Sequence, residues 1–211
     1  SGTAWTFSTG ATTVLKLDNN SLISLSNNDS NTGNTIIGKS IFNNSSNNDS
    51  DYNTLIGGSV MGTGAVAGAS HNVGIGSDAL NDATTASDNI AIGSSAMLNA
   101  TTSDGNVAIG RQAIGSGVLT GDNNTVVGKA AGAALTSGAS NVFIGNSAGA
   151  TPTTALRSIL IGATAGTNLT GGVAISSVIA IGYGALTGTG TQTTDINHTI
   201  AIGTSTLANL E

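Results

Sequence analysis

Residues 106–113 read Asn106-Val-Ala-Ile-Gly-Arg-Gln-Ala113, and variants of this octapeptide recur along most of the 211-residue chain. In each copy a short apolar run ends in a glycine, which we call the corner glycine, and Ala usually follows three residues later. Self-similarity at a period of about twenty residues indicates a repeat architecture. The ten corner glycines, spaced 17 to 21 residues apart, are Gly38, Gly57, Gly76, Gly93, Gly110, Gly128, Gly145, Gly162, Gly182 and Gly203.

Each repeat predicts one coil of a β-solenoid. The apolar runs are rich in Ile and Val and are too short for a helix. A glycine permits a tight corner, and a small Ala fits a narrow interior. We therefore expect an all-β fold, a repetitive parallel β-solenoid or β-roll with about ten coils of 17 to 21 residues. We expect the repeat domain over residues 33–211 and a small N-terminal β-hairpin or cap over residues 1–32.

The apolar runs also predict which side chains face inward. Side chains of a strand alternate between its two faces, so the residues one and three before the corner glycine share a face. We call these positions the flanking columns and expect them to form the core of the solenoid, because they are mostly Ile and Val. The Asn that opens seven repeats is expected to form a side-chain ladder along the rod.

The position two before the corner glycine, the strand-centre column, is expected to point outward. None of its residues is polar, so we expect it to be covered by other copies of the chain in a coaxial homotrimer. The predicted trimer interface comprises Ile36, Leu55, Ala91, Ala108, Val126, Phe143, Leu160, Ala180 and Ala201, and Gly74 occupies the same column.

The unit Val107 to Ala113, with the pattern Val-Ala-Ile-Gly-x-x-Ala, resembles the head repeats of trimeric autotransporter adhesins. Related repeats occur in phage tail fibres. The resemblance covers about residues 34–207 and implies a left-handed homotrimeric β-roll that presents a binding surface. The coils are longer than is usual in those adhesin heads, and neither their neck motif nor a coiled-coil stalk is found. In the length and variability of its loops the chain is more similar to the tail fibres.

The composition excludes several function classes. Charged residues make up 8% of the chain, and its five Lys and Arg form no cluster in a molecule of net charge -6, so nucleic acid is not an expected partner. No window approaches eighteen consecutive apolar residues, so we expect no membrane insertion. The absence of Cys excludes disulfides and Cys-based zinc sites. Ser1-Gly2 and Leu210-Glu211 resemble cloning scars, so we expect the chain to be part of a longer protein.

Catalytic and metal chemistry is not predicted. His71 and His198 are the only two histidines and lie in distant coils, which do not meet in a parallel solenoid. Paired Asp residues on adjacent coils lack an apolar pocket that would raise a pKa. The segments 27–31 and 47–51 offer oxygen ligands, but not in the spacing of a calcium loop. We therefore expect no enzyme activity, no cofactor and no metal.

The expected function is attachment: a trimeric fibre segment, most simply of a phage tail fibre, whose outer loops bind a cell-surface glycan or protein receptor. Its expected location is extracellular, on a virion or a bacterial surface. The alternatives are a bacterial trimeric autotransporter adhesin head, an ice-binding β-solenoid and a hexapeptide-repeat acyltransferase. The candidate binding residues are Tyr52, Tyr183, Thr189, Thr191, Asp195 and His198.

Overall fold

The fold was analysed in a computed structural model of the chain. It describes residues 5–9, 12–17, 22–24, 33–41, 50–62, 68–170, 175–188, 190–191 and 196–208. Side chains are described for 33–41, 50–62, 68–169, 175–188 and 196–208. Within these ranges every regular element is a β-strand, which confirms the all-β expectation.

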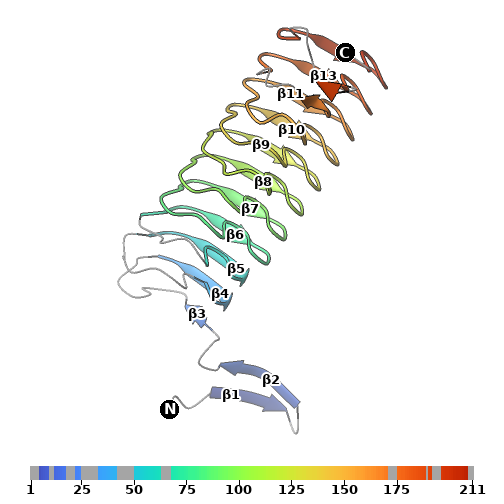
Figure 1. Cartoon of the computed structure of the whole chain (residues 1–211). Coiled ribbons are helices and arrows are strands. Elements are labelled where there is room, and N and C mark those ends of the chain that lie inside the picture. The colour runs from blue at the N-terminus through green and yellow to red at the C-terminus, as the bar shows by residue number, and fades with distance from the viewer. Residues whose placement is uncertain are drawn as a thin grey trace.

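Ten parallel strands stack into one sheet, and each comes from one of the ten predicted repeats (Figure 1). The chain therefore forms the expected β-solenoid. The ten strands are β4 (Thr35–Lys39), β5 (Thr54–Gly58), β6 (Val73–Ile75), β7 (Ile90–Ile92), β8 (Val107–Ile109), β9 (Thr125–Val127), β10 (Val142–Ile144), β11 (Ile159–Ile161), β13 (Ile179–Ile181) and β15 (Ile200–Ile202).

Five further short strands lie outside this stack of ten. Near the N-terminus, β1 (Trp5–Thr9) pairs antiparallel with β2 (Thr12–Leu17). β3 (Leu22–Ser24) adds to the large sheet as an antiparallel neighbour of β4. β12 (Leu169–Thr170) and β14 (Gly190–Thr191) form a small parallel pair within the last, longest coils.

The corner glycines are required both by backbone angle and by space. All ten have φ between 124° and 147°, a region that residues with a Cβ rarely adopt. Successive corners also stack directly on one another. A Cβ at Gly110 would lie 2.6 Å from the carbonyl of Gly128 in the next coil. Glycine at this position therefore lets the backbones of neighbouring coils approach closely.

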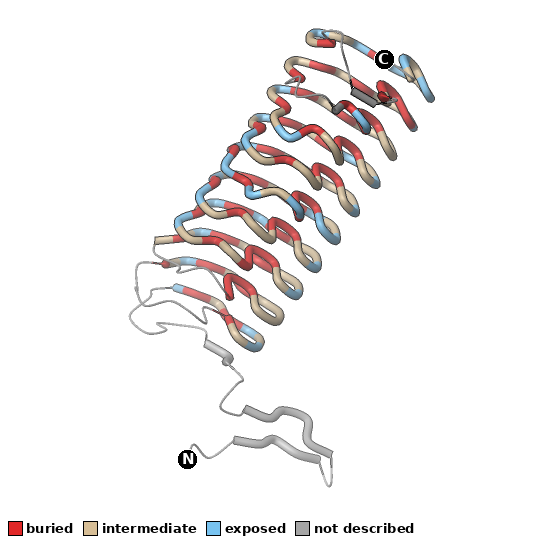
Figure 2. The backbone as a smooth tube through the Cα atoms, viewed as in Figure 1, coloured by how far each residue is buried: buried red, intermediate tan, exposed pale blue. Residues whose placement is uncertain are grey.

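The predicted orientation of the strands is wrong. Every residue of the proposed trimer interface is 0% exposed in a single chain, so the strand-centre column lines the interior of the solenoid. The sequence analysis treated the rest of each coil as a polar loop that could cover nothing. In fact Ala79, Leu80, Ala83 and Ala86 are also 0% exposed and complete an apolar lining. Buried positions recur at the same places in successive coils (Figure 2).

The residues that were predicted to form the trimer interface all belong to the core of one chain. They are Ile36, Leu55, Ala91, Ala108, Val126, Phe143, Leu160, Ala180 and Ala201. Because these side chains are buried inside one chain, they cannot form an interface between chains.

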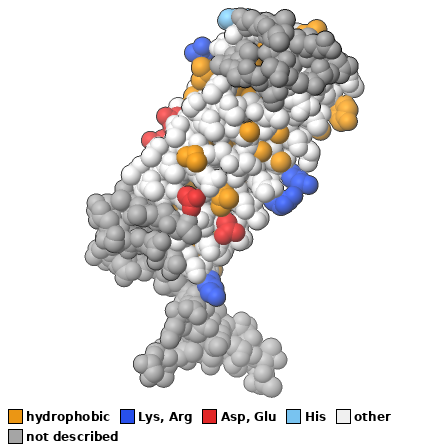
Figure 3. Space-filling view, viewed as in Figure 1, with side chains coloured by type: hydrophobic (Ala, Val, Ile, Leu, Met, Phe, Trp, Pro, Cys, Tyr) orange, Lys and Arg blue, Asp and Glu red, His pale blue; other side chains and the backbone are white. Residues whose placement is uncertain are grey.

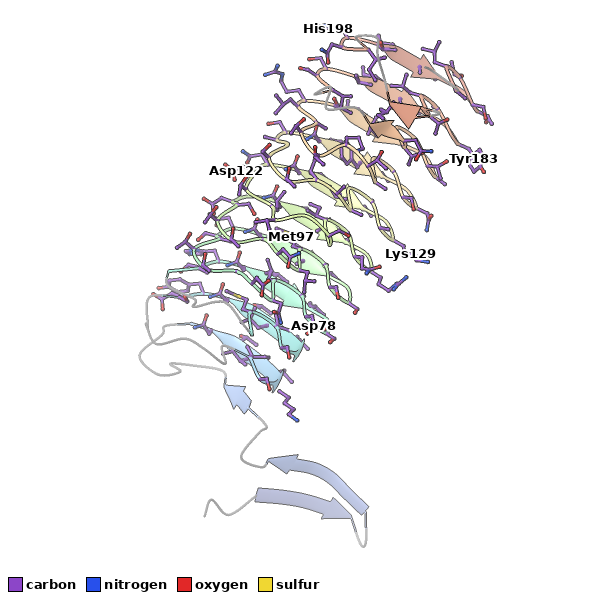
Figure 4. The ribbon with its side chains drawn as sticks, viewed as in Figure 1. Asp78, Met97, Asp122, Lys129, Tyr183 and His198 are labelled. Carbon is purple, nitrogen blue, oxygen red and sulfur yellow. The ribbon has the colours of Figure 1, made fainter. Side chains whose placement is uncertain are left out.

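In the coils from β6 to β13, large and small residues compensate one another between two interior positions. Where the strand-centre residue is small, as at Ala91, the residue four after the corner glycine is large, here Met97 (Figure 4). Where the strand-centre residue is large, as at Phe143, that later position is Gly149. A Cβ on Gly149 would lie 2.7 Å from the Phe143 ring. In the coils from β6 to β13 the interior therefore holds one bulky side chain per pair, which is typical of close packing. The coil of β5 differs, because Leu55 and Met61 are both 0% exposed.

The repeated asparagines form the expected ladder. Asn34, Asn53, Asn72, Asn89, Asn106, Asn124 and Asn141 are each at most 1% exposed. Asn106 is representative: its Oδ1 accepts the Asn124 backbone N–H at 2.9 Å, and its Nδ2 donates to the Gly121 carbonyl at 3.0 Å. Both partners belong to the next coil, so each side chain links two coils through buried hydrogen bonds.

We expect Asn106→Ala to lower the free energy of unfolding by about 2–5 kcal/mol, because two buried backbone groups would lose their partners. Equilibrium unfolding in urea measures this change. The control is Asn146→Ala, at an exposed asparagine outside the ladder, which should change stability by less than about 0.5 kcal/mol. Equal losses in the two variants would contradict a role for the ladder in stability.

The size compensation predicts a non-additive pair of substitutions. Gly149→Leu should destabilise the protein because its side chain would meet the Phe143 ring. Phe143→Ala should cost about 3–5 kcal/mol through the cavity that it leaves. The double variant, which copies the pairing of Ala180 with Leu186, should be more stable than the sum of the two single losses. Thermal unfolding of all four proteins tests this, and strict additivity would show that the two positions do not share space.

Candidate interaction surface

The outer face of the ten-strand sheet is apolar and open in a single chain. It is built from the flanking columns, which the sequence analysis assigned to the core. None of these twenty residues is buried, and seventeen of them are Ile or Val. Ile109 is 37% exposed and Ile144 38%, while Ile200 and Ile202 in β15 each reach 64%. The most hydrophobic columns of the repeat therefore face away from the chain's own core.

This outer face is regular because the strands pair without a register shift from β4 to β15. Val107 pairs with Thr125 and Ile109 with Val127, so side chains of one column lie directly above one another. At a strand spacing of roughly 4.8 Å the ten strands span about 43 Å, and three residues per strand give a width of about 10 Å. A continuous apolar patch on the order of 400 Å² is often an interaction surface.

Two edges border the outer face. The leading edge consists of residues five and six before each corner glycine, and the trailing edge of residues one and two after it. Asp88, Asp104 and Asp122 are exposed on the leading edge, which also carries one exposed cation, Arg157. Lys39, Arg111 and Lys129 are exposed on the trailing edge. Asp122 and Lys129 flank the same strand, β9, and lie on opposite sides of the stack (Figure 4).

Hydrogen bonds fix the carboxylates of the leading edge. Asp104 Oδ1 accepts the Ser87 backbone N–H at 2.7 Å, and Asp122 Oδ1 accepts the Asp104 backbone N–H at 2.8 Å. In both cases the donor belongs to the preceding coil. The two carboxylates are therefore held at defined heights along the rod, although both residues are exposed.

Among the candidate receptor-binding residues, Tyr52 packs within the leading edge. Its ring stacks on that of His71 in the next coil, with centroids 5.1 Å apart and an interplanar angle of 21°. On Gly33, in the preceding coil, a Cβ would lie 2.7 Å from Tyr52 Cδ1. The Tyr52 ring thus lies between neighbouring coils. The stacking on His71 reduces the area of the ring face that a bound sugar could contact. The sequence analysis did not predict the contact with His71.

The other candidate binding residues do not form one site. Tyr183 is 64% exposed on the trailing edge, and His198 is exposed on the leading edge at the opposite side of the rod (Figure 4). Thr191 lies in β14, but its side chain is outside the described part of the structure. Thr189 and Asp195 lie outside the described residues altogether. The described members of the predicted set, Tyr52, Tyr183 and His198, are therefore separate exposed groups on two edges.

The rest of the described surface offers little local chemistry. On the face drawn in Figure 3, a small number of charged side chains lie among mostly uncharged groups. Within the described ranges, no three His, Asp or Glu residues group so that they could hold a metal ion. The same residues contain no helix long and apolar enough to cross a membrane.

Comparisons with family models, with curated proteins and with solved structures found no significant match to this chain. The resemblance to adhesin heads and tail fibres therefore rests on the repeat motif alone.

Proposed function

We propose that this chain is a non-enzymatic structural segment of an extracellular attachment fibre that assembles as a homotrimer. The observation that carries the proposal is the continuous outer face of Ile and Val along a regular rod. Leaving such a face in water is unfavourable, and the chain has no described element that covers it. Other copies of the chain, which present the same face along the same length, are the simplest partner for it.

The proposed interface differs from the one that the sequence predicted. The flanking columns, including Ile109 and Ile144, would meet around a central axis, while the strand-centre column stays inside each chain. The repeat motif favours a left-handed coaxial trimer of the kind found in the adhesins and tail fibres that it resembles. We place the fibre on a virion, as part of a phage tail fibre. The head of a bacterial trimeric adhesin is the alternative that the same motif supports.

The mass of the protein in solution tests this assembly. We expect light scattering to give about 61 kDa, three times the chain mass of 20.4 kDa. Ile109→Asp combined with Ile144→Asp should reduce the mass to that of one chain, because two charges would be buried at the axis.

The matched control is Val118→Asp. Val118 is 53% exposed and therefore more accessible than Ile109, but it lies outside the ten-strand sheet. This variant should remain trimeric. A wild-type mass of 20.4 kDa would contradict the trimer and leave an open, flat apolar face on a monomer. Inhibition of ice growth would then be the next property to measure.

Receptor attachment is tested separately from assembly. In this proposal the trimeric rod binds a glycan or protein on the host cell surface through Thr189, Thr191 and Asp195, whose sequence positions lie outside both edges. We expect the triple variant Thr189→Ala, Thr191→Ala and Asp195→Ala to weaken binding to glycan arrays or to intact bacterial cells by several-fold while leaving the mass unchanged. Tyr52→Ala is the control, because the Tyr52 ring stacks on His71. Unchanged binding in the triple variant would remove these three residues from the receptor site.

A further inference from the structure

We infer that the two edges of the outer face are complementary seams, so that the leading edge of one chain docks on the trailing edge of a second copy, parallel and at the same coil. This inference rests on the proposed self-association and specifies its geometry. The observation that carries it is the distribution of charges on the two edges. The outer face of Ile and Val lies between these edges.

The charges of the two edges match within single coils. β8 has Asp104 on its leading edge and Arg111 on its trailing edge, and β9 has Asp122 and Lys129. Rotation about an axis along the rod brings the leading edge of one copy beside the trailing edge of the next at equal height. Each carboxylate would then face a cation from another chain. Within the described residues, neither Arg111 nor Lys129 has a carboxylate partner in its own chain.

The opposite orientation is unfavourable. Antiparallel chains that overlap along all ten strands would place one leading edge against another, with β8 beside β9, and so bring Asp104 of one chain close to Asp122 of the other. Like charges placed together at an interface disfavour that arrangement and select against the wrong partner geometry. These two carboxylates therefore favour parallel chains independently of the apolar face, which by itself would accept either direction. Arg157, the cation of the described leading edge, lies beside β11, where the trailing edge carries no charge.

Asp78 favours a seam without stagger, in which equivalent coils of two chains lie side by side and neither chain is shifted along the rod. Asp78 lies on the trailing edge beside β6 (Figure 4). The leading edge beside the same strand carries His71. In a seam without stagger, Asp78 faces His71 of the neighbouring chain. A shift of one coil in one direction would place Asp78 against Asp51, and a shift in the other direction would place it against Asp88. Both shifts create like-charge contacts, whereas the unshifted seam has none at β6, β8 or β9.

Cysteine cross-linking tests the seam, because the chain contains no cysteine of its own. The variant with Asp104→Cys and Arg111→Cys carries its two thiols on opposite edges, so a short thiol cross-linker should join different chains. We expect a closed covalent species of three chains on a denaturing gel. Asp104→Cys alone and Arg111→Cys alone should give almost none. The pair Asp104→Cys and Lys129→Cys, one coil out of register, should react more slowly.

The outcomes separate this inference from the proposed assembly. A trimeric mass without cross-linking of the Asp104 and Arg111 pair overturns the seam and leaves the trimer standing. Dimers formed by Asp104→Cys alone show antiparallel chains and also overturn it. If the pair at Asp104 and Lys129 cross-links faster than the pair at Asp104 and Arg111, the chains are shifted by one coil and the unstaggered seam is wrong. A monomeric wild type overturns both proposals.

Charge exchange gives a second measurement that does not depend on thiols. Arg111→Glu with Lys129→Glu makes both edges acidic and should weaken association about tenfold or more at low salt, with less effect at high salt. Adding Asp104→Lys and Asp122→Lys exchanges the two edges and should restore most of the association. The control, Thr153→Glu with Ser137→Glu, adds charge at exposed positions outside both edges and should have little effect. Failure of the exchanged variant to recover would contradict the pairing.

Discussion

The buried asparagine ladder is the interaction on which the rest of the solenoid depends. Each side chain fills a site that the next coil must complete, because its Oδ1 accepts a backbone N–H and its Nδ2 reaches a loop carbonyl of that coil. From Asn53 to Ser158, each residue of this column donates its backbone N–H to the side-chain oxygen of the asparagine before it, over distances of 2.7 to 3.1 Å. The strands therefore begin at the same place in every coil, which aligns the corner glycines and the columns of the outer face.

The architecture could be predicted from the sequence because the repeat fixes it several times over. The recurring glycine, the short runs of Ile and Val and the repeated Asn all indicate one strand per coil, and each of the ten repeats supplies one. The orientation of the strand could not be read with the same rule. Alternation shows which residues share a face, but both faces of these runs are apolar, so hydrophobicity alone does not identify the inner one.

A different signal in the sequence identifies the inner face. Gly132, Gly149 and Gly166 occur in the three coils whose strand-centre residues are Val126, Phe143 and Leu160, and large residues such as Met97 occur where the strand centre is Ala. Such compensation requires the two positions to share one enclosed space. The stacking of Tyr52 on His71 also left a signal, because both residues lie five positions before a corner glycine and so occupy the same place in neighbouring coils.

The same compensation bears on how the chain finds its fold. Ten nearly identical strands with equivalent hydrogen bonds could pair one coil out of step, and an outer face of Ile and Val would hardly distinguish the result. The interior would distinguish it where the bulky position changes, between β8 and β9 and again between β11 and β13. Phe143 fits beside Gly132 and Gly149 but has no such space beside Met97. The core thus marks two points along the stack at which a pairing one coil out of step would not fit, in a chain whose surface is repetitive.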